Sequence, residues 1–155
     1  DCSFEHCDLT RANVSNLALR EVAFEHCKLM GIDWSYVSSF PAVSFSDCNM
    51  HYVSMVQLAL RKTRFVRCAF VEANLIKTDL AEAVFEDCVF TGARLEDCDL
   101  RKASFADARD LFIDPSKNNV KGARIPVESA VLLAASFGMQ VFGYTQGKNK
   151  AGRAK

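Results

Sequence analysis

The feature of the sequence that most constrains its fold is a large apolar residue at every fifth position. Twenty-one such centres follow one another from Phe4 to Phe105, with a single six-residue step after Trp34. Since only half of the chain is hydrophobic, chance would produce this run in fewer than about one in a million cases. The centres are Phe4, Leu9, Val14, Leu19, Phe24, Leu29, Trp34, Phe40, Phe45, Met50, Met55, Leu60, Phe65, Phe70, Leu75, Leu80, Phe85, Phe90, Leu95, Leu100 and Phe105.

A period of five fits neither an α-helix nor a flat β-strand. On a helix the centres would scatter around the axis, and on a strand they would alternate between the two faces. The backbone must therefore turn a corner every five residues, as in a solenoid. Phenylalanine recurs at about every twentieth residue (Phe4, Phe24, Phe45, Phe65, Phe85 and Phe105), which predicts four pentads per coil. The residue two before each centre is uncharged and is often Cys or Ala, so we expect it to point inward as well.

Three pentads carry a recognisable motif: Ala12-Asn13-Val14, Ala73-Asn74-Leu75 and Cys98-Asp99-Leu100. This pattern resembles the A(D/N)LXX consensus of the pentapeptide-repeat family. The resemblance implies an all-β fold, a right-handed quadrilateral parallel β-helix, followed here by a short C-terminal capping helix. Asp110 and Pro115 fall on would-be centres, so we expect the last coil to be irregular.

The sequence predicts three segments. Residues 1–125 form the solenoid, residues 126–146 form a C-terminal module, and residues 147–155 form a disordered basic tail rich in Gly and Lys. In the module, Pro126 is expected at the first position of a helix, Gly138 at its end, and Met139–Phe142 in a short strand.

The C-terminal module contains more apolar residues than the end of one small coil can cover. The surplus predicts a homodimer formed through this module. The expected interface residues are Leu132, Leu133, Phe137, Met139, Val141 and Phe142.

The order of elements in the module resembles one subgroup of the family, the quinolone-resistance proteins of the Qnr and McbG type. The resemblance implies a non-enzymatic, DNA-mimicking dimer that binds a type II topoisomerase, DNA gyrase or topoisomerase IV, and modulates its inhibition. An acidic stripe beside the Phe column would then imitate the phosphates of DNA: Glu5, Glu25, Asp47, Glu86, Asp87 and Asp107. Two alternatives remain open, a generic interaction scaffold with an unrelated partner and a stripe that is only a solvated face.

The residues that suggest other chemistry have simpler interpretations. The seven cysteines lie at inward positions where Ala and Val also occur, so we expect buried, reduced thiols and no metal site. His6 and His26 point outward, away from the cysteines that follow them. The sequence holds no phosphate-binding glycine loop and no nucleophile–histidine–acid pattern, so we expect neither enzymatic activity nor a cofactor.

Charge is balanced overall but unevenly distributed. Residues 1–116 hold eighteen acidic and twelve basic residues, and residues 117–155 hold one acidic and seven basic residues. We therefore expect no direct nucleic-acid binding by the acidic body, with the basic tail as the remaining alternative. The chain opens with Asp1-Cys2-Ser3 rather than a signal peptide and has no long apolar run, which predicts a cytoplasmic protein without a membrane partner. The six-residue step is expected to place Tyr36 on a corner bulge.

Overall fold

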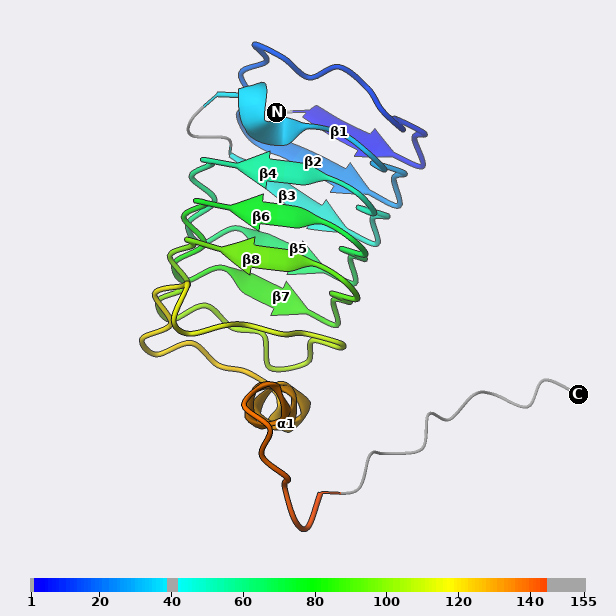
Figure 1. The fold of residues 1–155 in the computed structure, drawn as a ribbon. Coiled ribbons are helices and arrows are strands. Elements are labelled where there is room, and N and C mark those ends of the chain that lie inside the picture. Colours follow the sequence, from blue (N-terminus) through cyan, green and yellow to red (C-terminus); the bar gives the residue numbers. More distant parts are fainter. Residues whose placement is uncertain (1, 39–41, 145–155) are drawn as a thin grey trace, which may run out of the picture.

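The computed structural model describes residues 2–38 and 42–144, and its main body is a parallel β-solenoid (Figure 1). Two parallel sheets lie on opposite sides of the rod, in the strand orders β1-β2-β3-β5-β7 and β4-β6-β8. The first sheet contains β1 (Cys2–Glu5), β2 (Val22–Glu25), β3 (Val43–Ser46), β5 (Arg64–Val66) and β7 (Val84–Glu86). The second contains β4 (Ser54–Val56), β6 (Asn74–Ile76) and β8 (Arg94–Glu96).

On the other two sides of the rod, neighbouring coils are joined by isolated β-bridges. Lys28 pairs with Asn49 on one of these sides, and Asp79 pairs with Asp99 on the other. The chain runs to the right along the distant sheet and to the left along the near sheet while it descends, so the solenoid is right-handed (Figure 1). The predicted quadrilateral β-helix is thereby confirmed.

Stacked phenylalanines form the centre of the core. Phe45 lies on Phe65 with 5.2 Å between ring centroids, Phe65 on Phe85 with 4.8 Å, and Phe85 on Phe105 with 4.6 Å, and each pair of rings is nearly parallel. These distances are close to the spacing of neighbouring strands, because each ring occupies the same place in its coil. The register Phe24↔Phe45 confirms that the six-residue step shifts the repeat by one residue without breaking the column.

Most corners are made by left-handed backbone two residues after a centre. Seventeen of the described residues other than glycine have a positive φ, among them Lys62 at 62° and Lys77 at 53°. The amide of each of these two residues donates to the carbonyl of a residue in the following coil, Ala81 and Glu96 respectively, at 3.0 and 2.9 Å. The inter-coil bonds hold a conformation that L-residues otherwise disfavour.

The six-residue step forms a short 3₁₀ helix, η1 (Trp34–Tyr36), which begins with a hydrogen bond from the Ser35 amide to the Asp33 carboxylate. Trp34 is buried between Phe24 and Phe45, whereas Tyr36 is 66% exposed. The structure therefore places Tyr36 on a protruding corner. The next expected centre, Phe40, lies outside the described residues.

The last coil departs from the pentad pattern, as Asp110 and Pro115 predicted. Neither residue enters the core, and Leu111 and Ile113 are buried in their place. The repeat then returns at the end of the chain's solenoid, where Arg124 pairs with Ser104.

Helix α1 (Val127–Ser136) crosses beneath the last coil (Figure 1). Pro126 is its N-cap residue, one position before the predicted place. Gly138 has a φ of 76° and ends the helix as expected. The predicted strand Met139–Phe142 is wrong, since the structure has no strand there. An isolated segment of this length has no neighbouring strand with which to pair.

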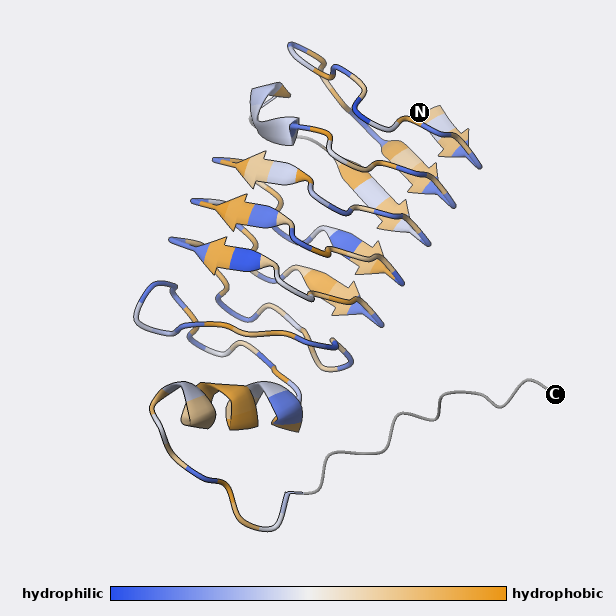
Figure 2. Ribbon diagram, turned by 45° about the vertical axis from the view of Figure 1, so that its right-hand side comes forward, coloured by the Kyte–Doolittle hydropathy of each residue, from blue (hydrophilic) through white to orange (hydrophobic). Residues whose placement is uncertain are grey.

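Helix α1 lies at the coil end and buries its apolar residues only in part: Val131, Leu133 and Ala134 are half-buried. Ser129 is its one buried residue, and Leu132 is 42% exposed. Figure 2 shows the apolar residues in the middle of the helix. Within the described residues, the structure has no helix long and apolar enough to cross a membrane.

Candidate partner-binding surfaces

The structure brings the predicted acidic residues to one long corner of the rod. Glu5 and Glu25 are paired in register at the ends of β1 and β2, and Glu86 ends β7 of the same sheet. Asp47 and Asp87 follow at the turn beyond that sheet, both with positive φ. We call this surface the acidic corner, and it comprises Glu5, Glu25, Asp47, Glu86, Asp87 and the exposed Asp107.

Arginines neutralise part of the acidic corner. Arg67 binds Asp47 through two hydrogen bonds of 2.6 Å, from Nε to Oδ1 and from Nη2 to Oδ2. These bonds lower the pKa of the Asp47 carboxyl, and the nearby His26 adds a weaker effect of the same sign. Arg64 donates to both carboxylate oxygens of Glu86 at 2.7 and 2.9 Å.

The remaining four acidic residues of the corner carry the charge that is available to a partner. Glu5, Glu25, Asp87 and Asp107 form no ion pair with any residue that the structure describes. They fall into two groups, one at the first coils and one at the last. Sequence reasoning missed Arg64 and Arg67 as neutralising residues, although a spacing of 20 to 22 residues from Asp47 and Glu86 indicates neighbouring coils.

The two histidines lie on the same corner and point away from the thiols, as predicted. His6 and His26 stack with centroids 4.8 Å apart, and Nε2 of His26 is 3.9 Å from Asp47. Both histidines are exposed, whereas Cys27 is buried. The described residues contain no group of three or more potential metal ligands.

Five of the seven cysteines are buried, and all seven are free thiols. All five buried thiols donate to backbone carbonyls, for example Cys98 Sγ to Leu75 at 3.1 Å and Cys27 Sγ to Phe4 at 3.2 Å. Burial raises the pKa of both Cys27 and Cys98. Cys2 is exposed and Cys7 is half-buried, so the expectation of buried thiols is wrong for these two residues at the first coil.

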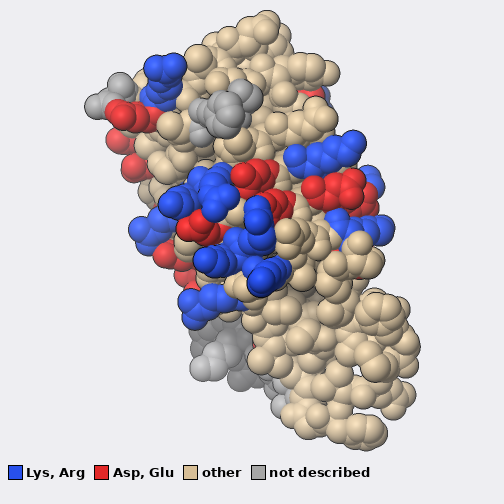
Figure 3. Space-filling model, turned by 90° about the vertical axis from the view of Figure 1, so that its left-hand side faces the viewer, with Lys and Arg blue, Asp and Glu red and all other residues tan. Residues whose placement is uncertain are grey.

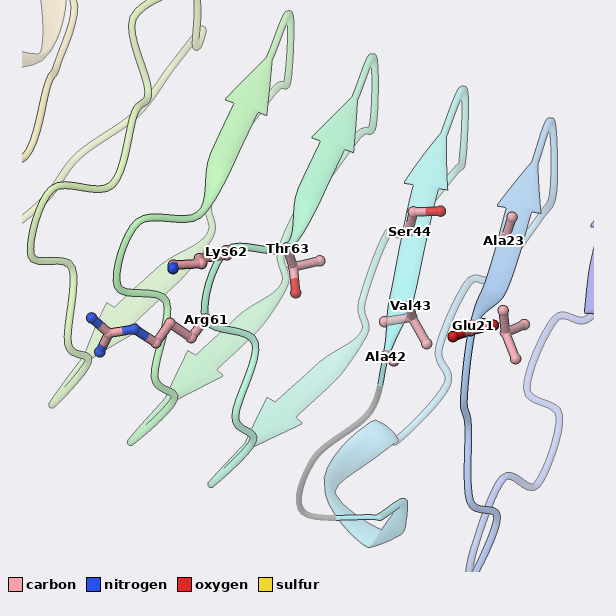
Figure 4. A pocket seen from close by; sticks show the side chains of 9 residues that line it. Glu21, Ala23, Ala42, Val43, Ser44, Arg61, Lys62 and Thr63 are labelled. Atoms are coloured by element: carbon pink, nitrogen blue, oxygen red, sulfur yellow. The ribbon is translucent and has the colours of Figure 1, made fainter. Parts of the chain in front are cut away.

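A shallow hollow of about 490 Å³ lies between the second and fourth coils (Figure 4). Its floor consists of small side chains such as Ala23 and Ser44, with Glu21 on one side. Arg61 and Lys62 lie on the other side and extend away from Ser44 (Figure 4), and Arg61 pairs with Glu82 at 2.7 Å. Because the charged groups do not converge on the hollow, it lacks the arrangement that catalysis requires.

A second charged surface lies along the neighbouring corner of the rod, where the chain turns just before it enters each strand of the first sheet. We call it the basic corner, and Figure 3 shows Lys and Arg gathered on this side of the molecule with acidic residues between them. Its members at the corner itself are Arg20, Arg61, Lys62, Arg101, Lys102 and Lys121, with the acidic Glu21 and Glu82. Arg124 is counted with them and lies just past the corner, in the register position that Arg64 occupies in an earlier coil.

The C-terminal module exposes the residues predicted to form a dimer interface. Phe142 is 91% exposed, Phe137 69% and Met139 58%, and Val141 is also exposed. Leu133 is half-buried. Exposed apolar surface of this extent on one short segment is typical of a region that contacts another protein.

Together these features define a class of protein: a solenoid rod that offers charged corners and an apolar end, in which the described residues form no enclosed reaction site. The sequence matches the family model for the pentapeptide repeat region over residues 1–75 and the model for pentapeptide repeats, in eight copies, over residues 68–107. The chain belongs to the pentapeptide-repeat family.

One solved structure supports this fold, and two further solved structures have lower similarity. A trypsin-treated variant of QnrB1, a plasmid-mediated fluoroquinolone resistance protein, has 18% identity and a TM-score of 0.57, over 90% of this chain and 68% of that one. A second trypsin-treated variant of QnrB1 has 17% identity and a TM-score of 0.48, over 90% and 88%. HetL of Nostoc sp. strain PCC 7120, involved in the regulation of heterocyst differentiation, has 14% identity and a TM-score of 0.38, over 80% and 83%. The comparison with curated proteins gave no match.

Proposed function

We propose that the protein is a non-enzymatic, cytoplasmic binding protein that docks in the DNA-binding groove of a type II topoisomerase, DNA gyrase or topoisomerase IV, and modulates its inhibition. The observation that carries the proposal is the acidic corner, in which carboxylates of stacked coils line one edge of the rod and are interrupted once, at Arg67. A groove that binds duplex DNA presents cations to a regularly charged rod. The similarity in fold to a fluoroquinolone resistance protein supports this choice of partner.

The acidic corner would act through its unpaired members. Glu5, Glu25, Asp87 and Asp107 are exposed and free of ion pairs within the described part of the chain, so a cationic groove gains attraction without first breaking an internal bond. Asp47 and Glu86 would contribute less, because Arg67 and Arg64 already compensate their charges.

A homodimer joined through the C-terminal module would extend the rod. Five to six coils at about 4.8 Å per coil give about 25–30 Å, so two rods joined end to end reach about 50–60 Å. The exposed side chains of Phe137 and Phe142 support this interface, since a second copy would remove them from water.

The second candidate function is a generic interaction scaffold with an unrelated partner. The ion pairs Arg67–Asp47 and Arg64–Glu86 favour it, because a surface that imitates DNA gains nothing from internal neutralisation.

A supercoiling assay distinguishes the two candidates. Gyrase activity is measured with and without the protein, in the presence and absence of a quinolone. The topoisomerase proposal expects a change in supercoiling or in quinolone sensitivity that is lost when Glu5, Glu25, Asp87 and Asp107 are all replaced by Gln or Asn. The scaffold alternative expects the activities of gyrase and topoisomerase IV to stay unchanged at every concentration at which the protein is in solution.

A further inference from the structure

We propose that the C-terminal end of the basic corner, formed by Lys102, Lys121 and Arg124, is a contact surface for the phosphate backbone of duplex DNA. The inference does not depend on topoisomerase binding. It rests on the position, the exposure and the unpaired state of these three cations, and on the shape of the corner that presents them.

The three cations lie on two neighbouring coils. The amide of Lys102 donates to the carbonyl of Lys121 at 3.0 Å, and the amide of Phe105 donates to the carbonyl of Arg124 at 2.8 Å. A Cβ at Gly122 would lie 3.3 Å from Cγ of Lys102, which shows how closely the two coils approach at this corner. All three cations are exposed. They therefore lie on two coils that are in direct contact.

None of these three cations has a carboxylate within ion-pair distance among the described residues, in contrast to the cations further up the corner. Arg61 and Lys62 both pair with Glu82, at 2.7 and 3.9 Å. Arg101 pairs with Asp99 in its own coil. Arg61, Lys62 and Arg101 are thus already partly neutralised, whereas Arg20 at the first coil forms no ion pair in the described chain. At the C-terminal end, Lys102 is near enough to Glu82 to help lower the pKa of that carboxyl, but it forms no ion pair with it. Lys121 and Arg124 have no carboxylate within ion-pair distance in the described chain, so an external anion would relieve the repulsion among the three cations.

The shape of the corner favours a polymer of phosphates over an acidic peptide. A peptide partner is usually held by a groove, by side-chain pockets or by a free strand edge. None of these three cations lines the hollow at Ser44 or the second hollow, which lies at Asp99 and Asn119. Sequence-independent binding to DNA requires only cations that reach the backbone.

The sequence adds four more cations to the same end of the chain. Lys148, Lys150, Arg153 and Lys155 follow in residues 145–155, which contain no acidic residue. The structure does not describe these residues. The experiment therefore measures their contribution to DNA binding separately from that of the described corner.

The test measures binding of the full chain to a fluorescein-labelled duplex of about 30 base pairs by fluorescence anisotropy, at several salt concentrations from about 25 to about 200 mM. We expect weak binding, with a Kd of about 10⁻⁴ to 10⁻⁶ M, that falls steeply as salt is added. Lys102→Gln, Lys121→Gln and Arg124→Gln should each reduce the slope of log K against log salt by about one. Arg11→Gln is the matched control, because Arg11 is exposed, lies in the first coil and has no ion pair in the described chain.

Two further arms separate the alternatives. A chain ending at residue 144 should retain binding with a smaller slope, and the three substitutions should then abolish it. The proposal is overturned if the full chain does not bind at the lowest salt concentration, if removal of residues 145–155 alone abolishes binding, or if Arg11→Gln weakens it as much as Lys102→Gln. Polyglutamate and unlabelled duplex are also compared as competitors at equal charge. If polyglutamate competes as well as the duplex, the proposal is overturned in favour of an acidic protein partner.

Discussion

The guanidinium of Arg67 binds both carboxylate oxygens of Asp47 at 2.6 Å, across two neighbouring coils. The two residues occupy equivalent corner positions twenty residues apart, each with left-handed backbone. The solenoid repeat thus converts a spacing in sequence into a bidentate ion pair, in the middle of a surface whose other members are mostly acidic.

Arg67→Gln should release the charge of Asp47. In the folded protein Arg67 lowers the pKa of Asp47, so the pair contributes stability above the unfolded pKa of about 3.9 and loses it as the pH falls through the folded value. We expect the Asp47 pKa of the variant to move up toward the ordinary value, measured by carboxyl NMR titration. The stabilities of the parent and the variant should differ at neutral pH and converge once the pH lies below the folded pKa.

The same variant tests the use of the acidic corner. With Arg67 removed, the corner is more negative, so any effect on a topoisomerase should become stronger, whereas Arg11→Gln, at the next corner of the first coil and outside the acidic corner, should not strengthen it. An Asp47 pKa that does not move would show that the ion pair is absent in solution.

Phe65→Asp should destabilise the protein severely. Phe65 is fully buried between Phe45 and Phe85, and a carboxylate there would have no partner. We expect a loss of about 4 kcal/mol or more in the free energy of unfolding, measured by chemical denaturation. Leu17→Asp is the control, because Leu17 is 47% exposed. An unchanged denaturation curve for Phe65→Asp would refute the assigned core.

The corner geometry makes a separate prediction at Lys77, whose φ is 53°. A β-branched residue is strongly disfavoured in left-handed backbone, so Lys77→Val should cost about 1–2 kcal/mol of stability. Lys77→Gly should change stability by less than about 1 kcal/mol, since relief of the backbone strain and the greater freedom of the unfolded chain oppose each other. Urea denaturation of the two variants gives the comparison, and a Val variant as stable as the Gly variant would contradict the assigned conformation.

The solenoid was predictable from the sequence because the repeat is a strict signal. Every pentad places its centre, such as Phe65, and the residue two before it in the core of the solenoid. These inward positions therefore tolerate few residue types. The same logic located the acidic corner. Where the period fails, at Asp110 and Pro115, the sequence predicted only that the last coil is irregular, and the structure was needed to show that Leu111 and Ile113 fill it.

Ion pairing and strand formation depend on neighbours that a periodic pattern does not specify. Arg64 reaches Glu86, twenty-two residues away, because its long side chain crosses diagonally to the next coil. The segment Met139–Phe142 has the composition of a strand, yet no strand of the solenoid lies beside it, so its backbone forms no ladder. Both outcomes require the three-dimensional arrangement.

The C-terminal module should join two copies of the protein, and Leu133→Ser with Phe142→Ser should separate them. Phe142 is 91% exposed, and Leu133 lies half-buried on α1, so the double variant lowers the apolar surface of the module without opening the Phe column. We expect light scattering to give a dimer for the parent at tens of micromolar and a folded monomer for the variant. Leu17→Ser, at the opposite end of the rod, should remain dimeric. If only the dimer is long enough to fill a groove built for duplex DNA, the monomeric variant should also lose its effect on a topoisomerase. A parent protein that is monomeric at these concentrations would rule out this arrangement.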